Sequence, residues 1–180
     1  MFPDPAASHQ LDEPERRWLD GVDLLHVPVY SLVAEPLATT ATTLVAWAHE
    51  AGLRVSVDAS SVGVLERAGV ARMVERLTQL RPYVLLANAA EARCLGAGLA
   101  GIGAEVTVVK HGAGPAEVLV AGRTTAVPAV AIGHVEDTTA AGDSFAAGFV
   151  TAAVAGADPV DCARAGHHLA AQILTSPTRP

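Results

Sequence analysis

Short apolar runs alternate with helical patterns along most of this 180-residue chain. The strand-like runs are residues 22–29, 53–58, 83–86 and 105–110. Helical patterns separate them at residues 36–51, 65–77 and 89–95. A strand–helix–strand rhythm is typical of a mostly parallel sheet with helices on its faces, because parallel neighbours need a long crossover connection. The sequence therefore predicts an α/β fold.

The remaining segments complete this prediction. A turn at residues 111–115 leads into a predicted hairpin from 117–120 to 124–130, and two alanine-rich helices follow at 141–155 and 159–174. Residues 1–20 are polar and contain three prolines, so we expect a loosely held lead-in with a short helical piece at 13–19. We expect residues 21–180 to form one domain.

Composition excludes several classes of protein. With 51% hydrophobic and only 17% charged residues, most of the chain is not expected to be disordered. A net charge of -7 argues against a nucleic-acid partner, which requires a basic face. No apolar run approaches the roughly 18 residues that cross a bilayer, and no signal peptide is recognisable. The two cysteines lie far apart and predict neither a disulfide framework nor a CxxC metal site. We expect a soluble, cytoplasmic protein.

The segment DTTAAGDSF, residues 137–145, lies where a strand-derived loop enters a helix. Ligands of open parallel sheets bind at such loops. The small residues Ala140, Ala141 and Gly142 leave the backbone amides uncovered, so these amides are suited to binding an anion at the start of the helix. Asp143 follows in the first turn, as expected of a base that deprotonates a nucleophile. A simpler hypothesis is that Asp143 caps the helix and the alanines only pack.

Two further loops carry candidate residues. The segment KHGAG, residues 110–114, places two glycines after a strand, where the backbone can approach a flat or anionic ligand. An ordinary hairpin turn has the same appearance. The segment NAAE, residues 88–91, puts an asparagine and a glutamate on one helical face, where they are suited to orienting phosphate and hydrated Mg²⁺. An ordinary capping box has this pattern too.

Together these segments resemble the ribokinase-like (PfkB) carbohydrate kinase family. DTTAAGDSF is similar to the family signature DTxGAGDxF, with alanine at the first glycine position. NAAE matches the family's NxxE element, and VVKHGAG matches its strand followed by a glycine turn. VSVDASS and DLLHVPVYSL resemble two further family segments, although Pro28 and Val29 replace the small residue and glycine usual in the second. The order and spacing of the five elements agree over about residues 20–175.

The resemblance implies a role for each matching residue. Asp143 is the implied catalytic base, and the amides of Ala140, Ala141 and Gly142 are the implied anion hole. The implied nucleotide-binding residues are Asn88, Glu91, Lys110, Gly112, Gly114 and His167. His167 stands where many relatives have asparagine. Glu91 is the implied Mg²⁺ contact through water, and Asp137 and Thr139 are the implied monovalent-cation site, with K⁺ as the ion.

The resemblance also implies a fold and an activity. The fold is a ribokinase-like three-layer α/β/α arrangement without the N-terminal strands and the lid, and residues 21–180 are its C-terminal ATP-binding and catalytic part. The implied activity is ATP-dependent phosphorylation of a hydroxyl group on a sugar-like molecule or a nucleoside. We expect a homodimer or a partner chain that supplies the N-terminal portion.

Two other classes of protein are alternatives to the kinase. One is a catalytically silent nucleotide-binding remnant or a subunit that needs a partner, and ATP binding without turnover distinguishes it. The other is an unrelated flavodoxin-like binding domain, which leaves DTTAAGD unexplained. We expect His26, inside an apolar run, to be a hydrogen-bonded core histidine, and Cys94 to serve packing.

Overall fold

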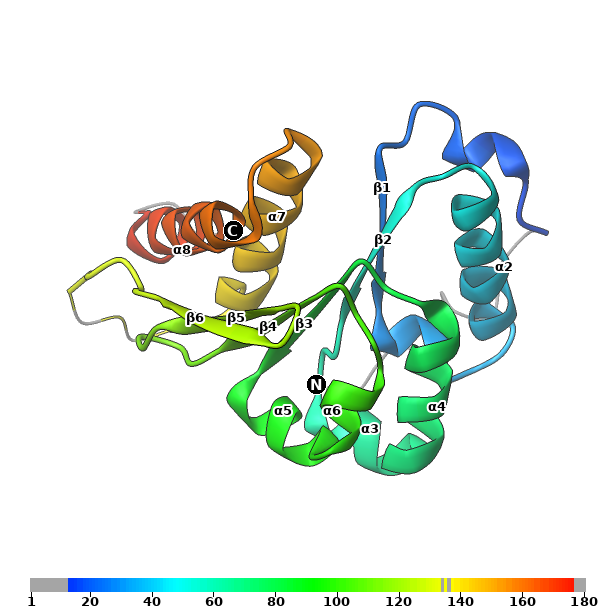
Figure 1. Cartoon of the computed structure of the whole chain (residues 1–180), viewed down its shortest axis with the longest axis horizontal. Helices are drawn as coiled ribbons and strands as arrows, with labels where there is room; N and C mark the ends of the chain where they lie inside the picture. Colours follow the sequence, from blue (N-terminus) through cyan, green and yellow to red (C-terminus); the bar gives the residue numbers. More distant parts are fainter. Residues whose placement is uncertain (1–12, 134, 136, 177–180) are drawn as a thin grey trace. The chain divides into compact units, whose positions relative to one another are not determined.

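The computed structural model describes residues 13–133, 135 and 137–176 of the chain. They form two compact units, of which the first ends at Ala104 and the second begins at Glu105. The cartoon colours the first unit from blue to green and the second from green to red (Figure 1). None of the described helices is long and apolar enough to cross a membrane. A domain boundary at residue 20 stays a prediction.

The first unit is built on three parallel strands. These are β1 (Leu24–Pro28), β2 (Arg54–Asp58) and β3 (Val84–Asn88). Strand β1 pairs with β2, with Leu24 opposite Arg54, and β2 pairs with β3. The central residues of β2 and the first four of β3 are buried, as expected for apolar strands covered on both faces. The three parallel strands that the apolar runs predict are therefore confirmed.

Helices connect these strands. They are η1 (Arg16–Leu19), η2 (Val29–Leu32), α2 (Leu37–Glu50), α3 (Val62–Ala68), α4 (Val70–Leu80), α5 (Ala89–Leu95) and α6 (Gly98–Gly101), where η denotes a 3-10 helix. Helix α2 buries Ala41, Val45 and Ala48, which recur on one helical face and join the core of this unit.

The helical pattern at residues 65–77 predicts one helix, and this prediction is wrong. The structure has two helices, α3 and α4, which meet at Gly69. Gly69 adopts a φ of 85°, a conformation that interrupts a right-handed helix and that glycine tolerates because it has no Cβ. Its carbonyl then accepts the amide of Met73 at 2.9 Å and so begins α4.

The expectation of a core histidine at His26 is also wrong. The side chain is exposed, and its Nδ1 lies 3.0 Å from the Ser56 hydroxyl. Within the described residues β1 pairs only with β2, and Val27 is its one buried residue. An apolar strand with a single neighbour does not bury every side chain. His26 is therefore more exposed than its place in an apolar run predicts.

The second unit contains an antiparallel group of strands. These are β4 (Val106–Lys110), β5 (Ala116–Val120) and β6 (Arg123–Val127). Val108 lies opposite Val118, and Leu119 lies opposite Thr124. The two residues between β5 and β6, Ala121 and Gly122, have φ values of 48° and 78°, as a tight two-residue hairpin requires. The predicted hairpin is confirmed.

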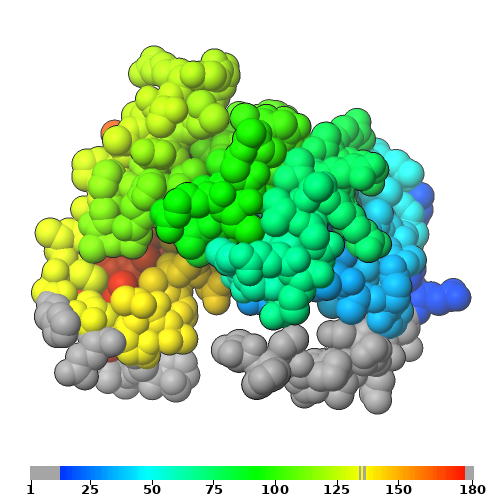
Figure 2. All heavy atoms as spheres, turned by 90° about the horizontal axis from the view of Figure 1, so that it is seen from below, coloured from blue at the N-terminus to red at the C-terminus, as the bar shows by residue number. Residues whose placement is uncertain are grey.

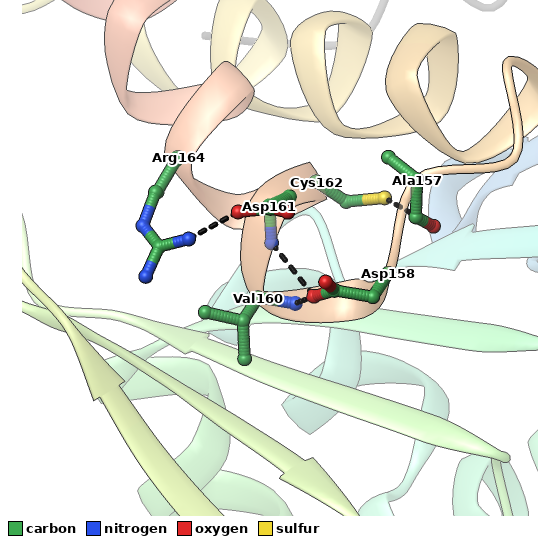
Figure 3. A network of polar contacts seen from close by, with 6 residues as sticks. All are labelled: Ala157, Asp158, Val160, Asp161, Cys162 and Arg164. Carbon is green, nitrogen blue, oxygen red and sulfur yellow. Dashed lines mark hydrogen bonds and ion pairs between the residues drawn. The ribbon is translucent and has the colours of Figure 1, made fainter.

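Two long helices, α7 (Ala141–Val154) and α8 (Pro159–Thr175), complete this unit. The Asp158 carboxylate caps α8 by accepting the amides of Val160 and Asp161 at 2.9 and 3.0 Å (Figure 3). Arg164 pairs with Asp161 one turn into the helix (Figure 3). Proline at the first helical position and an aspartate before it are standard starting signals, so the sequence predicts this boundary well.

Helices α7 and α8 touch backbone to backbone where they cross (Figure 1). A Cβ added to Gly148 of α7 would lie 2.7 Å from the Ala165 carbonyl oxygen. A Cβ added to Gly166 of α8 would lie 2.8 Å from the Phe145 carbonyl oxygen. These distances are shorter than any normal carbon–oxygen contact, so the crossing requires glycine on both helices.

His167 lies beside this crossing. Its ring packs edge-on against Phe145, with ring centroids 5.0 Å apart, and the residue is only 7% exposed. A hydrogen bond to the Val127 backbone favours the charged ring, but burial is the larger influence and lowers the pKa of His167 below its ordinary value of 6.5. The Nε2 atom has no hydrogen-bond partner among the described residues.

We expect His167 to make stability depend on pH. Because its folded-state pKa is lowered, the unfolded chain binds more protons below about pH 6.5, and the free energy of unfolding falls as the pH drops from there. Above that pH the neutral ring keeps its full contribution. His167→Gln keeps a side-chain donor but does not titrate, so its unfolding free energy should vary less between pH 5 and 7. Denaturant unfolding measures this.

His168→Gln is the matched control, because His168 is the exposed neighbour on the same helix. This control should keep most of the pH dependence, because burial lowers the pKa of His167 more than the charge of His168 does. If His167→Gln has the same slope against pH as the unsubstituted chain, the buried ring is not the titrating group.

Candidate functional site

The start of α7 is shaped by a left-handed residue. Ala140 precedes the helix with a φ of 66°. Asp137 stabilises the approach to it by accepting the Thr139 amide at 2.8 Å. A left-handed conformation costs an alanine about 1–2 kcal/mol, whereas glycine adopts it without strain. This explains why the resembling signature has glycine at the position of Ala140.

The amides of this loop are not all equally available to a ligand. The Ala141 amide donates to the Thr138 carbonyl at 3.1 Å, so it already has an acceptor. Within the described part of the chain, no acceptor is found for the amides of Gly142 and Asp143, which are the next two along the helix. An anion bound here would therefore accept hydrogen bonds from the amides of Gly142 and Asp143 more readily than from the amide of Ala141.

Asp143 is exposed in the first turn of α7. Its carboxylate makes no hydrogen bond or ion pair with the described residues, so it does not cap the helix. The space-filling view shows yellow and gold atoms, the colours of the loop before α7 and of the start of α7, at the surface (Figure 2). The helix-cap explanation of Asp143 is therefore weaker than the sequence alone allowed, and the carboxylate is accessible to a substrate.

Lys110 brings a positive charge to the same helix end. Its Nζ lies 3.8 Å from the position that a Gly142 Cβ would occupy. The same ammonium lies 6.0 Å from the centroid of the Phe145 ring, within cation–π range. Lys110 ends β4 and Gly142 begins α7, so the fold gathers an amine, exposed amides and a carboxylate within one unit.

The glycine turn that follows Lys110 is compact. Gly112 adopts a φ of 62°, and the Gly114 amide donates to the His111 carbonyl at 3.0 Å. The His111 Nε2 lies 3.7 Å from a carboxylate oxygen of Glu117 on β5. The turn is thus a hairpin connection, which is one of the two explanations that the sequence offers. A Cβ added to Gly112 would have no atom within 4 Å, so the turn is also open at this residue.

Asn88 and Glu91 form a complete capping box in the first unit. The Asn88 side-chain oxygen accepts the Ala90 and Glu91 amides at 2.9 and 3.0 Å. In return the Glu91 carboxylate accepts the Asn88 amide at 2.7 Å and its side-chain nitrogen at 2.6 Å. Glu91 is 3% exposed, so its two oxygens are held by the start of α5. The proposed roles of this pair toward phosphate and Mg²⁺ stay predictions.

The described residues contain no group of three or more His, Cys, Asp or Glu side chains that could hold a metal ion. Asp137 and Thr139 are both exposed at the start of α7, on the same loop as Asp143.

His167 is placed differently from the other predicted nucleotide contacts. Its ring is buried against Phe145, so it supports the helix crossing from inside, and its contact with a base stays a prediction. Sequence reasoning missed Phe145, which links His167 to Lys110. The signal available for it was the aromatic residue that closes the DTTAAGDSF segment.

Comparison with known proteins finds several kinases that are similar to this chain. An adenosine kinase from Schizophyllum commune is 48% identical over 68 residues, which is 38% of this chain and 19% of that protein. The crystal structure of a probable sugar kinase from Rhizobium etli CFN 42 has a TM-score of 0.81 at 24% identity, over 91% of this chain and 52% of that one. A putative ribokinase II from E. coli in complex with ATP and Mg²⁺ has a TM-score of 0.76 at 18% identity, over 90% of this chain and 55% of that one.

The chain thus spans about half the length of these solved structures and less of the adenosine kinase. The structural likeness shows the ribokinase-like α/β fold that the sequence predicts. The model of the pfkB carbohydrate kinase family matches residues 1–178, nearly the whole sequence. The chain therefore belongs to the pfkB family of carbohydrate kinases.

Proposed function

We propose that this chain supplies the ATP-binding and catalytic part of a kinase that phosphorylates a hydroxyl group on a sugar or a nucleoside. The observation that carries the proposal is the exposed Asp143 carboxylate, which has no partner among the described residues, beside the amides of Gly142 and Asp143, which have no acceptor among them. A carboxylate beside an anion-binding end is unfavourable for phosphate binding alone, because like charges repel. It is favourable where a proton must leave a nucleophile as a phosphoryl group arrives.

In the proposed reaction Asp143 accepts the proton of the substrate hydroxyl. The hydroxyl oxygen forms a bond to the γ-phosphorus of ATP, and the bond from that phosphorus to the leaving ADP breaks. The amides of Gly142 and Asp143 donate to the phosphoryl oxygens, and Lys110 adds positive charge at the same place. Bound Mg²⁺ would neutralise phosphate charge, with Glu91 acting through water. We place this activity in the cytoplasm.

A second candidate is a subunit that binds the nucleotide but turns over only with a partner. The β1 edge of the first unit favours it. Within the described residues β1 pairs with β2 alone, so its other edge leaves backbone amides and carbonyls without strand partners. We propose that a strand from the rest of such a kinase covers this edge, whether it belongs to the same polypeptide, a separate chain or a second copy.

The first prediction concerns the base. Asp143→Asn keeps the size of the side chain but removes its ability to take a proton. Phosphoryl transfer in the complete enzyme should fall by about 10²–10⁴, whereas affinity for a non-hydrolysable ATP analogue should change only a few-fold. A turnover assay with sugars and nucleosides, run beside calorimetry, measures both.

Asp161→Asn is the matched control, because Asp161 is an exposed acidic residue in the first turn of α8. It should leave turnover unchanged. Undiminished turnover in Asp143→Asn would refute the assignment of the base, and nucleotide binding without turnover in the unsubstituted chain would favour the silent-subunit candidate.

The second prediction concerns K⁺. An ion bound by Asp137 and Thr139 would fix the loop before α7 and add positive charge near the phosphates. Severalfold higher activity or nucleotide affinity is therefore expected in K⁺ than in Na⁺ at matched ionic strength. Asp137→Asn should reduce the difference. An equal response to K⁺, Na⁺ and a bulky organic cation would contradict the site.

The third prediction concerns the β1 edge. Since an unpaired strand edge is a template for association, the isolated 180-residue chain should self-associate or be marginally stable, and it should not be an efficient monomeric kinase. Sedimentation with a panel of sugars and ATP tests this. A stable monomer that phosphorylates a sugar at ~1–100 s⁻¹ would contradict it.

A further inference from the structure

A groove lies between α2 and α4 in the first unit, outside every segment assigned above. Its volume is about 240 Å³. It is lined by Thr42, Val45, Ala46, His49, Arg76, Gln79, Leu80 and Arg81. The kinase proposal uses none of these residues, so the groove is an independent feature of the chain.

Two helical stripes form the walls. On α2 the lining positions are spaced 0, 3, 4 and 7 from Thr42, and on α4 they are spaced 0, 3 and 4 from Arg76, so each set occupies one helical face. Val45 and Leu80 are each 3% exposed and give the groove an apolar part. Arg76 and Arg81 give it a basic part.

This basic surface is unusual for an acidic chain with a net charge of -7. None of the lining residues, all within the described part of the chain, is Asp or Glu. Two nearby carboxylates, Glu35 and Glu50, already have partners, and Glu75 is an exposed acidic neighbour of Arg76 on α4. Glu35 accepts the Thr39 amide at 3.0 Å and hydroxyl at 2.7 Å, bonds that lower its pKa more than the charge of Arg76 does. Glu50 pairs with Arg16 at 2.7 Å.

Several carbonyls at the negative ends of the two helices have hydrogen-bond donors. The His49 Nε2 donates to the Leu80 carbonyl at 2.8 Å, and the Arg81 amide donates to the Thr78 carbonyl at 3.1 Å. At the end of α2 the Gly52 amide donates to the His49 carbonyl at 3.0 Å. Because these carbonyls have donors, they repel an incoming anion less than bare helix C-termini would.

The two arginines are presented differently. The Nη1 atom of Arg76 donates to the Leu32 carbonyl at 2.6 Å, which orients the guanidinium and leaves it further N–H groups. Arg81 is exposed and makes no ion pair with the described residues. It adopts a φ of 45° at the end of α4, a position where glycine or asparagine is usual. Local backbone preference therefore does not explain why an arginine stands at this position.

We propose that this groove binds a small organic anion. Its carboxylate or phosphate group meets the guanidinium groups of Arg76 and Arg81, which match the geometry of such oxyanions. Its carbon part lies over Val45 and Leu80. The volume equals that of about eight water molecules, so the ligand is compact.

Amide chemical shifts of the 180-residue chain test the proposal. Butyrate tests for a ligand with a carboxylate group, and methyl phosphate tests for a ligand with a phosphate group. One of them should cause saturable shifts at residues 42–49 and 76–81. Arg81→Gln should weaken this binding about tenfold, since a hydrogen bond to a charged group is lost. Arg72→Gln, an exposed arginine of α4 outside the groove, should leave it unchanged.

The same spectra separate this proposal from the kinase proposal. Shifts at residues 140–143 report the start of α7, and Asp143→Asn should leave the groove's affinity unchanged. The proposal is overturned if neither probe gives saturable shifts at the groove, if shifts are confined to residues 140–143, or if Arg81→Gln binds as tightly as the unsubstituted chain. Arg76→Gln serves only as a second variant, because it also removes the bond to Leu32.

Discussion

The backbone contact between α7 and α8 determines where the proposed chemistry lies. Gly148 and Gly166 let the two helices meet without side chains between them. Phe145 lies one turn before Gly148 and packs against His167. The Lys110 ammonium lies over the face of the Phe145 ring. The position of the Asp143 carboxylate relative to the Lys110 ammonium therefore depends on a contact five residues further along the helix. A larger side chain at Gly148 would displace both groups without touching a substrate.

Much of the fold follows from patterns in the sequence. The alternation of apolar runs and helical patterns predicts the parallel strands of the first unit, and Pro159 after Asp158 predicts the start of α8. Both depend on local physics, either burial of a repeated face or satisfaction of free amides. The departures have two different causes, one local and one non-local. Gly69 breaks a helix through its own φ, whereas the exposure of His26 depends on which strands flank β1.

The candidate site divides in the same way. The motif pattern is sufficient to predict Asp143 in the first turn of α7 and the turn at Gly112 and Gly114, because each is a short segment with a fixed shape. The approach of Lys110 to Gly142 is not predictable from spacing, since it joins a strand end to a helix 32 positions away. The buried ring of His167 is likewise a product of helix packing. Motifs predict which groups are present, and packing decides which of them meet.

The Asn88–Glu91 pair shows why a structural role and a functional role do not exclude each other. The hydrogen bonds that begin α5 fix both side chains, and they hold a glutamate that is 3% exposed in one orientation. A carboxylate already held in this way loses little conformational freedom when it orients a water molecule, whereas a mobile surface glutamate would lose more. The capping box thus explains the fixed orientation of both side chains, and a water-mediated metal contact of Glu91 stays a prediction.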